Sequence, residues 1–483
     1  MASVSKSLSD FQSPTSSKIG LLTLATINVT TVVSLGGLPS EAKYGLSAVF
    51  YYLFAAIFFL IPVALVSAEL TTGWPKEGGV FRWVAEAFGD LWALIAVCSL
   101  WMSFTILFPS CLIYGATALA FSGPDVLWDK ALATNKYYVI TIVLSLYWLA
   151  TFITLKGSEY ATKVASWGGL VGTIAPAFLL IIFGVFYYFS GRPMYVDIAW
   201  SDFFPDFTNT HNLVLAAGIF LCYAGIELNS VHVTEIRNPA RFFPIAISLA
   251  SLITVLIYAL GTLTIAFIIQ PGQIDLTQSL LVTFRDFFKL FEIPILEPAI
   301  NIALAIGAFS AVILWLSGPS RALMIAAEAG YLPPFLQKLN DREIPSRIIL
   351  LQGIIVTILS SAFILMPSVE ATFQIFNQLV TILYLAMYLL MFAAAIRLKY
   401  SHGNIYRPFV VPGGVIGMWF IAGCGILASL TAFVISFMPP SQIEVGNPLD
   451  YSIILVICFL LTISLPLALY FLAKPEWKEK SKN

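Results

Sequence analysis

The stretch SLGGLPS at residues 34–40 interrupts an apolar segment that is otherwise long enough to form a membrane helix. Gly36 and Gly37 lower helix propensity, and Pro39 lacks the N–H group that a helix interior needs. A second stretch, YAGIELNS at residues 223–230, places a glycine, a carboxylate and an amide inside another apolar segment. Irregular backbone is tolerated at membrane depth only where it lines a cavity or packs within protein. Both stretches therefore predict discontinuous helices in a membrane protein.

The composition of the whole chain supports this environment. Of the 483 residues, 59% are hydrophobic and 11% are charged, and the mean hydropathy is +0.90, whereas about 25% of the residues in soluble domains are charged. The apolar segments are continuous rather than alternating, which favours helices over a β-barrel. We predict an all-α polytopic membrane protein with twelve transmembrane helices. Their approximate cores are residues 19–38, 46–69, 91–121, 137–155, 163–189, 211–232, 244–269, 297–317, 347–366, 371–396, 413–437 and 450–473.

The basic residues predict the orientation of these helices. Six of the 25 Lys and Arg fall in loops on one side, and the remaining 19 fall on the side of both termini. Because Lys and Arg are enriched on the cytoplasmic side, the tails at residues 1–18 and 474–483 are predicted to be cytoplasmic, in a cell membrane. The polar first 18 residues have no apolar core of a signal peptide, so no removed segment is expected. The six residues on the opposite side are Lys43, Lys130, Lys136, Arg192, Arg285 and Lys289.

Acidic residues and net charge add two further expectations. Glu69 and Glu227 are the acidic residues that we assign to the membrane, within or at the edge of a predicted span. The net charge of −1 leaves no basic surface for the phosphate backbone, so nucleic acid is excluded as a partner.

Residues 76–89 are predicted to form an amphipathic helix on the cytoplasmic face, and residues 270–294 an interfacial helix outside.

The two interruptions lie five helices apart, in the first and sixth predicted spans. These are corresponding positions if residues 19–190 and 191–400 form an inverted repeat, with residues 401–473 adding two helices. Paired discontinuous helices of this kind mark the central site of secondary transporters, although ordinary kinks in a bundle are the alternative. The N–H groups after Gly36 favour a carboxylate, and the carbonyls near Gly225 can accept an ammonium group. Together they predict a site for an amino acid zwitterion.

Motifs for enzyme chemistry are not found in the sequence. It contains no phosphate-binding loop, no HExxH and no GxSxG, and its three histidines are isolated from one another. The five cysteines lie in apolar segments without metal-ligand spacing, which favours simple packing. We therefore predict a protein that is not an enzyme and that needs no cofactor and no metal.

Several motifs are similar to those of a known family. They are EGGVF at residues 77–81, FFPDF at 203–207, the stretch at 223–227, GPSR at 318–321 and PGG at 412–414. With these motifs the chain resembles the amino acid/polyamine/organocation (APC) superfamily of transporters, and most closely the bacterial glutamate/GABA antiporters. The resemblance covers nearly the whole chain and implies five plus five inverted helices that exchange amino acids by alternating access.

The resemblance also implies substrate-site residues. Tyr384 and Tyr388, one turn apart in the tenth helix, match aromatic positions around the substrate, and Trp315 matches a tryptophan beside the same cavity. Glu227 matches a glutamate that shapes the pathway. The antiporters have a tyrosine and a glutamate where this chain has Gly36 and Gly37, and a glutamate where it has Ala311. These departures predict a roomier and less acidic site. The antiporters also end in a long tail that plugs the cytoplasmic mouth, which the residues after 474 do not resemble.

Each candidate also has a structural alternative. Thr31 and Ser34 can line the site with Gly36, Gly37, Tyr223 and Gly225, or can bond carbonyls one turn back. Tyr384 and Tyr388 can be packing residues with satisfied hydroxyls. Glu227 and Glu69 are the candidates for gating or proton transfer, but Glu227 can also bond unwound backbone, and Glu69 can extend to the membrane surface.

These features predict a secondary active amino acid transporter, working as an antiporter by alternating access, with an altered substrate site. A proton-coupled amino acid symporter of the same fold is the alternative. The expected partners are small amino acid substrates and the lipid bilayer, and no obligate protein partner is evident.

Overall fold

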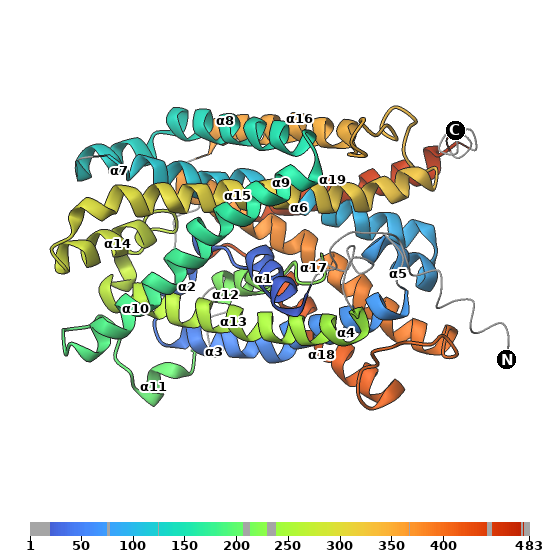
Figure 1. Ribbon diagram of the computed structural model, residues 1–483, viewed down its shortest axis with the longest axis horizontal. Helices are drawn as coiled ribbons and strands as arrows, with labels where there is room; N and C mark the ends of the chain where they lie inside the picture. The colour runs from blue at the N-terminus through green and yellow to red at the C-terminus, as the bar shows by residue number, and fades with distance from the viewer. Residues whose placement is uncertain are drawn as a thin grey trace.

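The computed structural model describes residues 20–74, 78–123, 125–205, 213–228, 238–366, 368–441, 447–474 and 477. Throughout these residues the regular structure is helical, as predicted, and the helices run side by side along the longest axis (Figure 1). Ten helical segments in the described part of the chain are long and apolar enough to cross a membrane. Each matches one of the predicted spans, and the two predicted spans without such a helix are the interrupted first and sixth.

The ten long segments are formed by the following elements: α3 (Ser47–Ala55), η2 (Ala56–Leu60) and α4 (Ile61–Gly73); α6 (Asp90–Ala120); α8 (Lys136–Leu155); α9 (Ser158–Gly169), η3 (Leu170–Ile174) and α10 (Ala175–Phe189); α13 (Pro239–Ile268); η7 (Pro294–Leu296) and α15 (Glu297–Glu328); α16 (Ser346–Ala362) and η8 (Phe363–Leu365); α17 (Val369–Ser401); α18 (Gly414–Ile435); and α19 (Pro448–Leu472).

The first predicted span is broken where its glycines and proline predict. The helix α1 (Leu21–Val32) ends in extended backbone at Val33 and Ser34. A short turn, η1 (Leu35–Gly37), then leads into α2 (Leu38–Ala42), which has Pro39 in its first turn, where the missing N–H costs no hydrogen bond. This helical segment continues past residue 38, where the predicted span ends. Glu41, which follows the end of the predicted span, is therefore buried in α2.

The sixth predicted span is also broken. The helix α12 (Val214–Cys222) ends in turns over residues 223–228, and Gly225 has a φ of +101°, which favours glycine. The remaining residues of this span, 229–232, lie outside the described residues. At nine residues, α12 is much shorter than the roughly 20 that a spanning helix needs.

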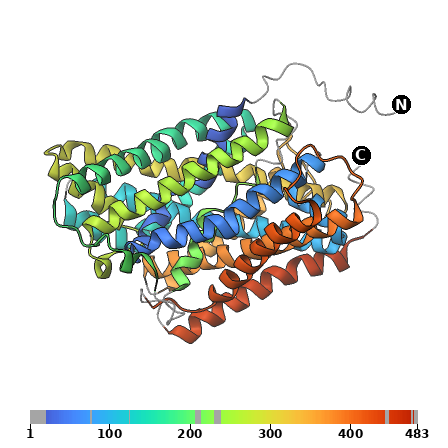
Figure 2. The ribbon, with the colours of Figure 1, turned by 90° about the horizontal axis from the view of Figure 1, so that it is seen from below.

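The long helices form an inner and an outer group. Within their most apolar windows, 78% of the α6 residues and 72% of the α17 residues are buried, compared with 17% for α19. Figure 2 shows α19 (red) along one side of the bundle, where Phe471 and Leu472 are largely exposed. Exposed apolar side chains on outer helices are what contact with lipid requires. The substrate site must therefore be sought around α6 and α17.

Small residues allow close helix contact within the bundle. A Cβ atom built on Gly172 in η3 would lie 2.2 Å from the Ala303 carbonyl oxygen, and one on Gly307 in α15 would lie 2.3 Å from the Gly172 carbonyl oxygen. Such close approach of two backbones is typical of helix packing in membranes. This close approach at Gly172 and Gly307 brings η3 directly against α15.

Short amphipathic helices lie at the two ends of the bundle. The helix α5 (Gly79–Phe88) lies at one end, and α7 (Val126–Thr134) and α14 (Ser279–Leu290) lie at the other (Figure 1). The predicted helices at residues 76–89 and 270–294 are thus present and at opposite ends. Another short helix, α11 (Trp200–Phe203), precedes the sixth segment.

Candidate substrate cavity

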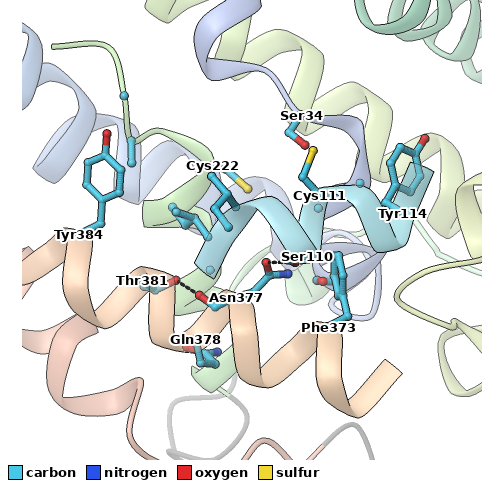
Figure 3. Close-up of a pocket in the computed structure, with 18 of the residues that line it drawn as sticks. Ser34, Ser110, Cys111, Tyr114, Cys222, Phe373, Asn377, Gln378, Thr381 and Tyr384 are labelled. Atoms are coloured by element: carbon cyan, nitrogen blue, oxygen red, sulfur yellow. Dashed lines mark hydrogen bonds between the residues drawn. The ribbon is translucent and has the colours of Figure 1, made fainter. Parts of the chain in front are cut away.

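A cavity of about 100 Å³ lies where the two broken segments meet α6, α15 and α17. Seven of the ten predicted substrate-binding residues line it: Thr31, Ser34, Gly36, Gly37, Gly225, Trp315 and Tyr384. Figure 3 shows Phe373, Asn377, Gln378, Thr381 and Tyr384 projecting from α17 along this cavity, with Ser34 and Cys111 opposite. The structure therefore brings together residues that are up to 353 positions apart in the sequence.

The first break is held in place by side chains from other helices. The Tyr258 hydroxyl on α13 donates to the Val32 carbonyl (3.0 Å) and accepts from the Ser34 N–H (2.9 Å). The Trp315 indole N–H donates to the Thr31 carbonyl (3.0 Å). The backbone groups released by the break thus have partners, as buried backbone requires. The Thr31 hydroxyl donates to the Ile27 carbonyl (2.7 Å), which is the predicted structural alternative for this residue.

The two glycines of the first break differ in their surroundings. A Cβ atom on Gly36 would lie 3.0 Å from Cγ of Tyr114, whereas one on Gly37 would meet Cys222 Sγ at 3.4 Å. A side chain at position 36 would therefore displace the Tyr114 ring, while a small one at position 37 fits. The N–H groups that begin η1 and α2 lie at this point, and the first N–H groups of a helix have no acceptor within it.

The second break is organised by a carboxylate behind the cavity wall. Glu227 is 1% exposed and does not line the cavity. It accepts hydrogen bonds from the Tyr384 hydroxyl (3.0 Å) and the Tyr388 hydroxyl (2.5 Å), and the Gly225 N–H donates to Tyr388 (3.0 Å). No Lys or Arg of the described residues forms an ion pair with Glu227. Of these residues only Tyr384 and Gly225 face the cavity.

Two other predicted substrate residues, Tyr223 and Tyr388, also lie behind the wall. Tyr223 is fully buried and its hydroxyl donates to the Tyr52 carbonyl (3.1 Å), which ties the end of α12 to α3. The Tyr388 ring stacks on the Tyr384 ring, with 5.1 Å between the centroids. In this conformation both tyrosines support the break rather than line the cavity.

Glu69 lies away from the cavity in an ion-pair cluster. Its carboxylate contacts the Lys399 ammonium (2.7 Å) and the Arg407 guanidinium (2.9 Å), and it accepts from the Val411 N–H (2.7 Å). With 1% exposure, its side chain is buried within the protein. The cluster connects α4 to the end of α17 and to the segment before α18.

Sequence reasoning missed several residues of the cavity. Glu41, Gln374 and Gln378 all line it, and each is at most 2% exposed. Glu41 lies four residues after Gly37, a spacing that places both on one helix face, but the predicted span ended at residue 38. The polar residues of α17 recur at helical spacing within an apolar segment, a signal that was present in the sequence. Glu41 thus adds to the cavity a carboxylate that the predicted substrate residues did not include.

The structure also shows where the cysteines lie and whether acidic, His and Cys side chains cluster as metal ligands. All five cysteines are free, and Cys111 and Cys222 line the cavity, although the sequence favoured packing for every cysteine. Over the described ranges, no group of three or more His, Cys, Asp or Glu residues is arranged to hold a metal ion.

Comparison with known proteins places this geometry in a family. A family model described as amino acid permease matches residues 19–459. The chain is 34% identical to an uncharacterized transporter of Legionella pneumophila over 92% of its own length and 93% of the relative's. It is 32% identical to a glutamate/gamma-aminobutyrate antiporter of Lactococcus lactis, over 94% of this chain and 90% of the relative. A probable agmatine/putrescine antiporter of Lactococcus lactis is 24% identical over 85% of this chain and 84% of the relative.

Proposed function

The chain belongs to the amino acid permease family and is an integral membrane amino acid transporter, and we propose that it works as an antiporter by alternating access. The observation that carries this proposal is the cavity between two broken helices, closed by polar and aromatic side chains. Paired breaks around a central cavity are how secondary transporters build a substrate site.

The substrate is an amino acid held at its two charged ends. Its carboxylate would meet the N–H groups that start η1 and α2, near Gly36 and Gly37, because a helix start favours negative charge. Its ammonium group would meet the carbonyls at the end of α12, before Gly225. Thr31, Ser34, Trp315 and Tyr384 would line the site, while Tyr223, Tyr388 and Glu227 would hold the second break.

Antiport is supported by the relatives that carry that name. Two glutamate/gamma-aminobutyrate antiporters of Lactococcus lactis match this chain at 32% identity over 94% of its length. We further propose twelve transmembrane segments, an inverted repeat of residues 19–190 and 191–400, two added helices, and cytoplasmic termini, since Lys and Arg divide unequally between the two sides.

Reconstitution tests the proposal directly. Purified protein in liposomes should take up labelled amino acid rapidly only when the lumen contains exchangeable substrate. Equal uptake into empty and loaded liposomes would overturn antiport while leaving amino acid transport intact.

One observation favours proton-coupled symport as a second candidate. Glu227 is a buried carboxylate at a helix break, bonded by two tyrosine hydroxyls and by no Lys or Arg among the described residues. A carboxylate in this setting can carry a proton. Symport predicts uptake into empty liposomes that follows a pH gradient and that is lost in Glu227→Gln. Glu159→Gln, at an exposed position on α9, is the matched control.

A further inference from the structure

Glu41 provides the cavity with a carboxylate that has no counter-charge and one unbonded oxygen among the described residues. The side chain lines the cavity and is 1% exposed, and its Oε2 atom has no hydrogen bond. No Lys or Arg of the described residues forms an ion pair with it. Lys43, two residues further on, interacts instead with Glu370 and Asp275, which oppose the lowering of its pKa by burial. Glu41 is therefore a buried acid without a counter-charge.

A second unpartnered acceptor lies in the same cavity. The Gln378 amide N–H donates to the Val214 carbonyl (3.0 Å), which fixes the amide orientation and leaves its Oε1 atom without a partner. Gln378 is 2% exposed, and Figure 3 shows it on α17 beside Asn377. Both of these oxygens are acceptors, so the ligand group that completes them must carry N–H or O–H donors.

The side chains of Glu41 and Gln378 approach the same face of α12. Glu41 Oε1 would lie 3.3 Å from a Cβ atom on Gly218, and Gln378 contacts Val214, which lies one helical turn earlier. Gly218 thus leaves the space that the Glu41 carboxylate occupies. The pair forms one polar end of the cavity, built from α2, α12 and α17.

The position of Glu41 within α2 sets the length of the ligand. It follows Gly37 by four residues, so it lies about 6 Å along the helix from the break that would bind the substrate carboxylate. That distance corresponds to several bonds of an extended chain. A zwitterion whose carboxylate is at the break can therefore bring the end of a flexible side chain to Glu41.

We propose that Glu41, with Gln378, binds the cationic side chain of a basic amino acid, and that this cavity selects lysine-like or arginine-like substrates over acidic ones. An unpaired buried carboxylate is costly, and a cation that donates several hydrogen bonds offsets that cost. A second carboxylate brought to the same place would be repelled. The inference rests on the proposed amino acid antiport and adds the class of substrate.

The test measures exchange in proteoliposomes with labelled arginine, lysine, alanine and glutamate. The full-length protein should exchange arginine and lysine in preference to glutamate. In Glu41→Gln, the ratio of arginine to alanine exchange should fall roughly thirtyfold, the effect of removing one partner from a buried charged pair. Glu41→Asp should recover part of that ratio, and Gln378→Leu should lower it to a smaller extent. Glu159→Gln, exposed on α9, is the control in which the ratio should stay unchanged.

The outcomes separate this inference from the function on which it rests. Exchange of alanine without exchange of arginine or lysine in the unmodified protein would overturn the selectivity and leave antiport standing. A ratio that is unchanged in Glu41→Gln would do the same. No exchange of any amino acid would instead contradict the proposed antiport. If Glu41→Gln does not fold, thermal stabilisation by added arginine, measured for the unmodified protein and for Gln378→Leu, tests the proposal instead. Equal stabilisation of the unmodified protein by arginine and by glutamate would refute the proposal.

Discussion

The acids at the ends of the bundle differ from those at its centre in whether they have a cationic partner. At one end, Arg285 on α14 bonds both Asp129 (2.7 Å) and Glu297, and at the other, Glu69 contacts Lys399 and Arg407. At the centre, neither Glu41 nor Glu227 forms an ion pair with Lys or Arg among the described residues, although Glu227 accepts bonds from two tyrosine hydroxyls. Acids of the first kind join helices together, whereas acids of the second kind lie where the helices are broken.

The difference has a physical cause. A buried charge is expensive, and a nearby opposite charge with good hydrogen bonds offsets most of the cost. Where a protein retains a buried acid without a counter-charge, the acid is usually functional, because a ligand or a proton must neutralise it. The presence or absence of a cation therefore separates structural from functional acids in this chain, and four substitutions test that separation.

The largest effect on stability is expected at Arg285. Arg285→Met removes the cation that pairs with Asp129 and Glu297 in the described structure, and leaves the buried Asp129 and the partly buried Glu297 unpaired. We expect a loss of about 3–5 kcal/mol in unfolding free energy, measured by denaturant unfolding in detergent. Adding Asp129→Asn should recover part of the loss. A loss below about 1 kcal/mol would show that this cluster does not hold the bundle together.

Glu69→Gln should have the next largest effect. It leaves the buried Lys399 and Arg407 without their shared carboxylate, although Arg407 keeps its bond to the Leu398 carbonyl (2.8 Å). We expect a loss of about 2–3 kcal/mol in stability and an unchanged ratio of arginine to alanine exchange. A changed ratio at normal stability would place Glu69 in the transport pathway instead.

Tyr388→Phe should have a moderate effect at the second break. It removes the donor to Glu227 and the acceptor for the Gly225 N–H, so two buried groups lose a partner. We expect a loss of about 1–2 kcal/mol and a reduced exchange rate. Tyr223→Phe is the matched control, because its hydroxyl makes one bond to the Tyr52 carbonyl. If both variants lose exchange equally, the contact with Glu227 has no special role.

Glu227→Gln should have the smallest effect on stability. The amide has nearly the same shape, and its oxygen and NH₂ group can each bond one of the two tyrosine hydroxyls, so we expect a change within about 1 kcal/mol. Exchange should nevertheless slow, because the charge at the break is lost. A stability loss as large as that of Glu69→Gln would remove the distinction between the two kinds of acid.

Local sequence signals predicted much of the fold. The glycines and proline at residues 36–39 and the glycine at 225 mark both breaks, and ten of the predicted spans match long helices. The cavity was predicted less completely. Seven of the predicted residues line it, but Tyr223, Glu227 and Tyr388 lie behind its wall. Glu41 was missed because hydropathy ended the first span before α2, whereas packing against α12 and α13 buries that short helix.

The sequence by itself determined the membrane environment and the places where helices break, because hydropathy, Gly and Pro act within a few residues. Only the tertiary structure decided which buried acids have partners. Arg407 lies 338 positions from Glu69, Arg285 lies 156 from Asp129, and Tyr388 lies 161 from Glu227. Pairing over such separations depends on which helix faces pack together, and that choice left Glu41 facing the cavity with no cation beside it among the described residues.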